Sequence, residues 1–243
     1  MRNACPWSLV TLAPLFPAVM IALGSTLQAQ RRPLSVDQLR VIFLSGGDVY
    51  GWDEYDVPEF VAAAYGARAK NAVIAILRDR STEENYYLQL EALTTAQYPK
   101  LGVPLGLLLE YVEGGRTAQL PLTLRGLLRH RALASLSMMP EPFLVPFWQA
   151  RLKEDDPSAR QMAVRGLACA LGDGAMPYLA PSLTDPDSSV KRVAVFYRQE
   201  FVSRGINARA CGGRHTRAET LDAPTEIRPG LRRMADNILR KIP

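Results

Sequence analysis

Apolar residues recur along most of the chain at the spacing of α-helices, and no segment sustains the alternation of a β-strand. Apolar positions three and four residues apart, with Ser, Thr and Asp before several runs, predict a series of helices joined by short turns. The predicted helices cover residues 35–44, 57–65, 70–79, 83–95, 103–113, 122–138, 141–154, 158–171, 175–184 and 188–203. Taken as antiparallel pairs, they predict an all-α fold.

Part of this pattern repeats with a period of 31 residues. LKEDDPSARQMAV at 152–164 aligns with LTDPDSSVKRVAV at 183–195, and LRHRAL at 128–133 aligns with the second half of the first segment. Each copy has an apolar residue, a basic residue, two variable residues, an alanine and another apolar residue. The alanines are Ala132, Ala163 and Ala194. A small residue there predicts that consecutive helices approach one another closely.

This motif resembles the HEAT repeat, in particular the short HEAT-like form of the phycobilisome-lyase group, with its Asp-Pro turn, basic residue and small alanine. The match is best over residues 140–204 and covers only the second helix of 103–139. The resemblance implies an α-α superhelix, a HEAT-like solenoid of about five helix pairs. It also implies that first helices lie on the convex side and second helices on the concave side.

Charged residues recur with the same period. Lys191 follows the cap sequence DPDSS and lies in the first turn of its predicted helix, where the helix dipole disfavours a cation. Arg129 and Arg160 occupy the equivalent positions. We expect a ladder in which each base pairs with a turn carboxylate of its own or the neighbouring repeat; binding of an anion is the alternative. The carboxylates are Asp155, Asp156, Asp185 and Asp187.

The two ends of the chain differ from the repeat region. Arg2 precedes an uncharged apolar run at 7–23 and a polar segment that contains Ala29, an order typical of a secretory signal peptide. We expect cleavage after Ala29 and export to the periplasm or medium; a retained anchor is the alternative. No second apolar run of spanning length is expected. The predicted domains are a signal peptide at 1–29, a HEAT-like domain at 30–204, an irregular linker at 205–229 and an amphipathic helix at 230–243.

The predicted C-terminal helix has an apolar face and a basic face. The apolar face consists of Leu231, Met234, Ala235, Ile238 and Leu239. Because solenoids need atypical ends, we expect this helix to cover the stripe around Val195 and Tyr197. The alternatives are a partner helix or an anionic membrane surface.

Residues with catalytic or metal-binding chemistry are few. The chain has two histidines, His130 and His215, and no CxxC pair, so the common zinc patterns are missing. With Cys5 removed by cleavage, Cys169 and Cys211 remain; they either pair in an oxidising compartment or Cys169 is a small buried residue. No nucleophile-base-acid set and no phosphate loop can be assembled. We therefore expect no enzyme, no metal and no cofactor.

Basic residues concentrate in the C-terminal half, which suits an acidic protein partner. Candidate contact residues on the second helices are Arg131, Arg165, Arg198 and Glu200. A second candidate is the loop at 45–56, in which acids alternate with Tyr50, Trp52 and Tyr55; these aromatics either bind a partner or seal the first repeat.

The sequence thus favours an exported, non-catalytic scaffold that binds another protein, with no nucleic acid expected. One alternative is a HEAT-like enzyme or nucleic-acid-binding protein, for which the resemblance offers phycobilisome lyases and HEAT-like alkyl-purine DNA glycosylases. Export argues against both. Another alternative is a membrane-surface adaptor that acts through the C-terminal helix.

Overall fold

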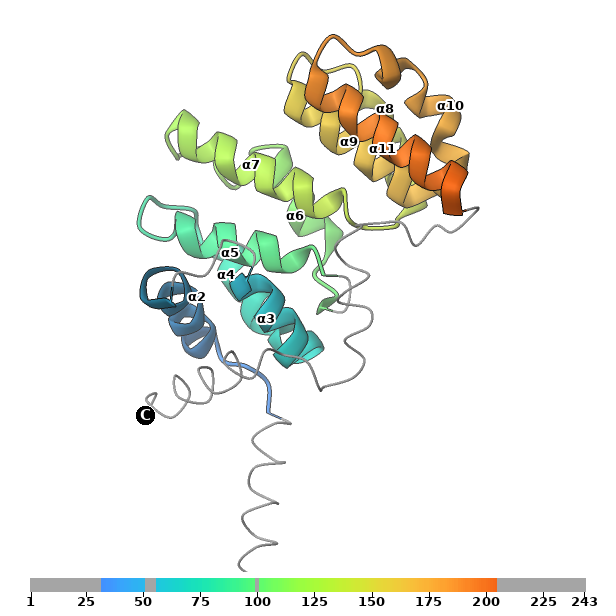
Figure 1. Ribbon diagram of the computed structural model, residues 1–243. Helices are drawn as coiled ribbons and strands as arrows, with labels where there is room; N and C mark the ends of the chain where they lie inside the picture. The colour runs from blue at the N-terminus through green and yellow to red at the C-terminus, as the bar shows by residue number, and fades with distance from the viewer. Residues whose placement is uncertain (1–31, 51–55, 99–100, 205–243) are drawn as a thin grey trace, which may run out of the picture. The chain divides into compact units, whose positions relative to one another are not determined.

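The computed structural model describes residues 32–50, 56–98 and 101–204, and for residues 45–50, 56 and 204 it describes the backbone alone. Every regular element in these ranges is a helix (Figure 1), which confirms the all-α prediction for this part of the chain. The described residues from Leu34 onward belong to one compact unit. The predicted signal peptide, linker and C-terminal helix lie outside the described residues.

The helices follow the predicted order closely. They are α2 (Val36–Tyr50), α3 (Asp56–Tyr65), α4 (Lys70–Arg78), α5 (Tyr86–Ala96), α6 (Leu105–Val112), α7 (Leu122–Leu136), α8 (Val145–Arg151), α9 (Pro157–Leu171), α10 (Met176–Leu179) and α11 (Ser188–Arg204). Short 3₁₀ turns are η1 (Gly66–Ala69), η3 (Pro142–Leu144), η4 (Gly172–Ala175) and η5 (Pro181–Thr184).

The first helices of the two best-matched repeats are shorter than predicted. In both, a 3₁₀ turn leads into an α-helix whose first turn contains a proline, Pro146 in α8 and Pro177 in α10. Proline lacks a backbone N–H and fits the first turn of a helix but not its interior. The predicted helices at 141–154 and 175–184 are therefore composite, and their α-helical parts begin at equivalent places 31 residues apart.

The predicted loop at 45–56 also needs correction, because α2 continues through Ser45 to Tyr50. The helix begins with a capping box in which Ser35 N–H donates to Gln38 Oε1 at 3.0 Å and Gln38 N–H donates to Ser35 Oγ at 3.2 Å. Gly46 and Gly47 each destabilise a helix by about 1 kcal/mol relative to alanine. Helix propensity is a weak constraint, and these residues do not end a helix whose earlier part has a buried face. Trp52 and Tyr55 lie outside the described residues.

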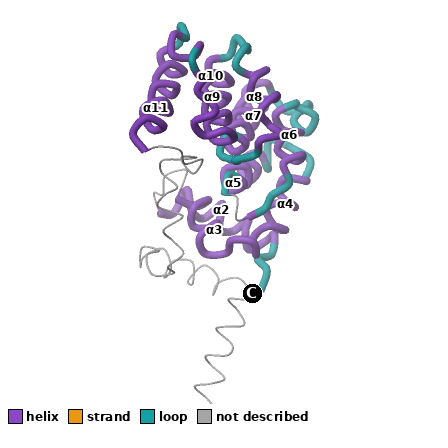
Figure 2. Tube along the Cα trace, turned by 90° about the vertical axis from the view of Figure 1, so that its right-hand side faces the viewer, coloured by secondary structure: helices purple, strands orange, loops and turns teal. Residues whose placement is uncertain are grey.

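The second helix of each pair contacts the second helix of the next. α5 packs against α7, α7 against α9 and α9 against α11, while α4, α6, α8 and α10 each pack against the second helix of their own pair (Figures 1 and 2). The residues at this seam are small or apolar and come from equivalent positions. Leu128, Ala159, Val190, Ala132, Ala163 and Ala194 are all fully buried.

A large side chain in one helix is matched by a small one in its partner. Trp148 of α8 is fully buried against Gly166 of α9, and a Cβ on Gly166 would lie 2.2 Å from Trp148 Cε2. The residues that follow these by 31 are Leu179 and Tyr197, both buried. In one repeat the large residue, Trp148, is on the first helix and the small one on the second; in the next repeat the first-helix residue is smaller and the second-helix residue is larger. This exchange keeps the total volume suited to close packing.

One described segment has the length and apolar composition of a membrane span, contrary to the expectation that no second such run exists. The segment is Val57–Arg78, which comprises α3, η1 and α4. Gly66 in η1 has a φ of 50°, and both α3 and α4 pack against α5. Val61 and Val73 are fully buried there. Core helices share this composition, and the buried residues of the segment belong to the hydrophobic core of the described part of the chain.

We predict that Gly166→Ala destabilises the fold by about 1–3 kcal/mol, because the added methyl group overlaps the Trp148 ring. Gly126→Ala is the matched control: Gly126 lies inside α7, and a Cβ there meets nothing within 4 Å. It should stabilise the fold by about 0.5–1 kcal/mol. Urea unfolding measures both changes, and equal midpoints for the two variants would contradict the described contact.

A candidate binding surface on the second helices

Arginines at equivalent positions of two second helices contact the following turn; Arg160 lies in the first turn of α9, whereas Arg129 lies midway along α7. Arg129 Nη2 lies 2.9 Å from Glu154 Oε2, and Arg129 Nη1 lies 3.6 Å from Asp156 Oδ2. One period later, Arg160 Nε and Nη2 donate to the two oxygens of Asp185, each at 2.9 Å. Both arginines thus bind a carboxylate 25 residues further along the chain. The contact recurs from one repeat to the next.

The other residues of the predicted ladder have different roles. Asp156 Oδ1 accepts a hydrogen bond from Ser158 N–H at 2.9 Å and caps α9. Asp187 Oδ1 caps α11 by accepting from the N–H of Ser189 at 2.8 Å. Asp155 contributes its backbone carbonyl, which accepts from Arg160 Nη1. Lys191 is exposed and forms no ion pair with the described residues.

Glu154 was missed from the predicted ladder. Its carboxylate accepts from Arg129 and also lies 3.0 Å from Arg151 Nε, and its carbonyl accepts from Arg160 Nη1 at 2.9 Å. Glu154 precedes Asp185 by one period. The 31-residue period could therefore have predicted this role of Glu154. The turn prolines are shifted between the two repeats, and this shift obscured the alignment of the turn carboxylates.

The Arg160–Asp185 contact is largely shielded from solvent, with 13% and 10% of the two side chains exposed. The paired hydrogen bonds to Arg160 lower the pKa of Asp185, and the same bonds raise the pKa of Arg160. Hydrogen bonds from the Ser189 hydroxyl and backbone lower the pKa of Asp187. Because Arg129 and Arg160 hold carboxylates of the chain itself, they are poorly placed to bind an external anion.

A strip of residues on α7, α9 and α11 stays accessible beside these contacts. We call it the second-helix surface and define it by Leu127, His130, Gln161, Arg165, Arg192 and Phe196. Leu127 and Phe196 are 47% and 43% exposed. His130, Gln161 and Arg192 occupy equivalent positions, as do Arg165 and Phe196. Only Arg165 was a predicted contact residue; applying the 31-residue period to polar positions would have found His130, Gln161 and Arg192.

Arg165 is half-buried at the centre of this surface. Its Nη1 lies 3.9 Å from Met138 Sδ, and its positive charge acts on the hydroxyl of Tyr197 on α11. Burial is the main cause that raises the pKa of Tyr197. Arg165 therefore places a positive charge between groups of the two neighbouring repeats.

The remaining predicted contact residues do not share one face. Arg131 and Glu200 are half-buried, whereas Arg198 is exposed. Arg198 follows Leu167 by one period, and Leu167 is fully buried in α9. Arg198 hence lies on the side of α11 that corresponds to the repeat interface, away from the second-helix surface. Of Tyr50, the last predicted contact within the described ranges, the structure gives the backbone alone.

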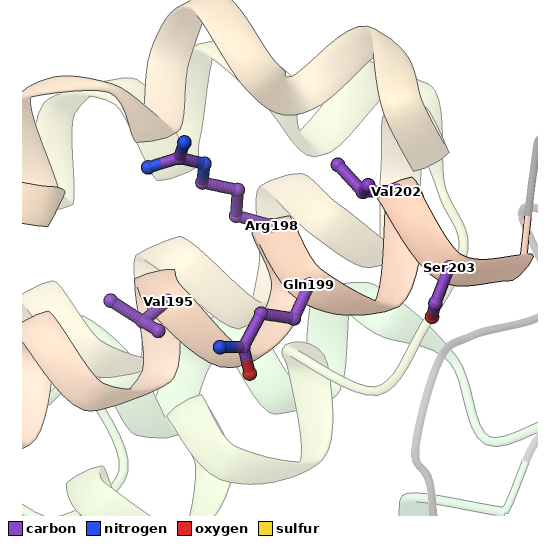
Figure 3. Close-up of a pocket in the computed structure, with 5 residues that line it drawn as sticks. All are labelled: Val195, Arg198, Gln199, Val202 and Ser203. Carbon is purple, nitrogen blue, oxygen red and sulfur yellow. The ribbon is translucent and has the colours of Figure 1, made fainter.

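Arg198 lines a shallow depression of about 530 Å³ on α11, together with Val195, Gln199, Val202 and Ser203 (Figure 3). All five residues come from this one helix. The depression is thus an open helix face rather than an enclosed ligand cavity.

His130 and Ser158 come together across a repeat junction, with 2.7 Å between His130 Nδ1 and Ser158 Oγ. The equivalent positions one period later hold Gln161 and Ser189, and the Ser189 hydroxyl donates instead to Asp187 Oδ1, so the histidine-serine pair does not recur there. In the described part of the chain, no group of three or more His, Cys, Asp and Glu side chains is arranged to hold a metal ion.

Cys169 is fully buried in α9 and is disulfide-bonded. The other two cysteines, Cys5 and Cys211, lie outside the described residues. A disulfide is typical of proteins that fold in oxidising compartments.

Comparison with models of known protein families found no match, and comparison with curated proteins found none either. Function therefore has to be inferred from the repeat geometry.

The pH dependence of stability tests the role of Asp185. Because its folded-state pKa is lowered, the carboxylate contributes stability that is present above its unfolded pKa of about 3.9 and is lost as the pH falls from there through the lower folded-state pKa. Asp185→Asn should destabilise the protein at neutral pH, and the gap from wild type should narrow at about pH 3. Urea midpoints across this range measure the gap. Asp173→Asn, at an exposed carboxylate in η4, is the control and should leave the profile unchanged.

Proposed function

We propose that the protein is an exported, non-catalytic HEAT-like scaffold that binds another protein through the second-helix surface. The observation that carries this proposal is the recurrence of one accessible strip on α7, α9 and α11, beside the seams at which α7 packs against α9 and α9 against α11. Residues in register on stacked helices offer an extended partner several equivalent contact points.

The proposal includes a solenoid arrangement of the helix pairs, with the second helices on the concave side. Two observations support it. Each first helix contacts the second helix of its own pair, and consecutive second helices contact one another from α5 to α11. The arginine-to-turn contact also recurs with the same spacing of 25 residues.

The chemistry of the surface suggests the kind of partner. Arg165 and Arg192 supply positive charge, and Leu127 and Phe196 supply exposed apolar area. Arginine and aromatic residues are enriched at protein interfaces, where a guanidinium pairs with carboxylates. An acidic segment with one or two apolar anchors would complement this strip.

Two observations support export: residues 1–29 contain a basic start, an apolar run and a polar segment in the order typical of a signal peptide, and Cys169 is disulfide-bonded. If cleavage occurs after Ala29, the mature chain lacks Cys5, and only Cys211 is left to pair with Cys169. Peptide mapping without reduction, on protein purified from its native cell envelope, should show an N-terminus at Gln30 and a linked Cys169–Cys211 peptide.

An intact Met1, or a linked Cys5–Cys169 peptide, would remove export from the proposal. It would also strengthen the nucleic-acid-binding alternative, which export disfavours. Co-purifying nucleic acid in place of protein would then be the expected companion finding.

Charge reversal on α11 tests the binding surface. The partner is first identified by affinity purification of the full-length protein at low and high salt and is then purified. We expect Arg192→Glu to weaken its binding about tenfold or more, since close charge pairs contribute roughly 1.5–7 kcal/mol across interfaces. Arg198→Glu is the matched control, with the same charge change at an exposed arginine on the other side of the helix. Equal affinities for both variants and wild type would rule out the second-helix surface.

A further inference from the structure

The last described helix, α11, has an open face that includes the depression seen in Figure 3. Val202 is 79% exposed and Val195 is 36% exposed. Both valines lie on the same side of α11, within two turns of each other. Together with the aliphatic parts of Arg198 and Gln199, they leave an apolar stripe uncovered by the described residues.

The repeat shows what normally covers this stripe. The residues one period before Val195, Arg198 and Gln199 are Val164, Leu167 and Ala168 of α9, which are fully or almost fully buried, and the residue one period before Val202 is Leu171, which is half-buried against the core. α9 packs closely against α11. By equivalence, the open face of α11 is the place at which the next helix of the stack would lie.

The chain itself continues beyond α11 and carries a segment that fits this place. Leu231, Met234, Ala235, Ile238 and Leu239 follow the i, i+3, i+4, i+7, i+8 pattern of a helix with one buried face. Residues 205–229 provide the connection, and at roughly 3.3 Å per extended residue they reach far more than the length of α11. The basic residues of the segment lie mostly off its apolar face, so they would remain in solvent.

We propose that residues 230–243 form a helix that docks on the open face of α11 and ends the stack. The apolar face of the segment is then occupied by the protein's own last repeat and is not available to a membrane or a partner helix. This goes beyond the proposed function and is independent of export, because it concerns a contact within the chain and not the second-helix surface.

A double-mutant cycle in the full chain tests the contact. Val202→Asp alters the α11 face, Met234→Asp with Ile238→Asp alters the segment, and all three changes are then combined. If the α11 face and the segment are in contact, Val202→Asp alone and the two segment changes alone each lower the thermal midpoint. The chain with all three changes then has a midpoint only slightly lower, because mutations of residues in contact are not additive. Leu122→Asp is the control: Leu122 is also 79% exposed but lies at the start of α7, so its effect should add to that of the segment changes.

Hydrogen exchange supplies a second readout that does not depend on stability. We expect amides at 231–242 to exchange at least about tenfold more slowly in wild type than in Val202→Asp, and to be unaffected by Leu122→Asp. Full additivity in the cycle, with equal exchange in all chains, would overturn the proposal.

Two other outcomes would overturn it as well. A concentration-dependent dimer that Val202→Asp abolishes would show that a second copy covers α11. Binding of the wild-type chain to anionic vesicles, lost on Met234→Asp with Ile238→Asp, would show that the segment is free for a membrane.

Discussion

Close contact between consecutive second helices is the constraint on which the rest of the structure depends. It requires small residues at one position of every repeat, and Ala132, Ala163 and Ala194 are fully buried there. Once the helices approach at that position, the arginine one turn earlier faces the next inter-helix turn. Arg129 and Arg160 therefore find carboxylates at the same distance along the chain, although the turns differ in sequence. The ion pairs follow from the packing period, and the Arg160–Asp185 pair also offsets the unfavourable position of a cation near the N-terminus of α9.

The size of core residues varies from one repeat to the next where the residues at two equivalent positions change together. Trp148 is accommodated because Gly166 presents backbone to its ring, and the equivalent pair is the smaller Leu179 with the larger Tyr197. Conserving total volume at a buried contact costs less than changing either member alone. This explains why the repeat is recognisable at the alanine and the basic residue, whereas the surrounding core positions differ in type and size.

Local signals predicted the helices well, and relations between repeats were harder to predict. The expected bounds of 122–138 and 158–171 lie within two residues of α7 and α9, because prolines and cap residues mark their starts. The end of α2 was missed since Gly46 and Gly47 normally favour turns, and a helix anchored elsewhere can override this. Which side of a helix stays accessible depends on the neighbour that covers it. Arg198 therefore looked like Arg165 in the sequence, although the two occupy different faces.

The distribution of charge within a repeat separates stability from recognition. Arg129 and Arg160 are paired with carboxylates of the following turn, and so contribute little to the field outside the protein. Arg165 and Arg192 lie further along the helices, beside exposed Leu127 and Phe196. A ligand that approaches this strip meets these charges and not the net charge of the C-terminal half. Recognition would therefore depend on the spacing of a few side chains set by the helix stack, more than on overall electrostatic attraction.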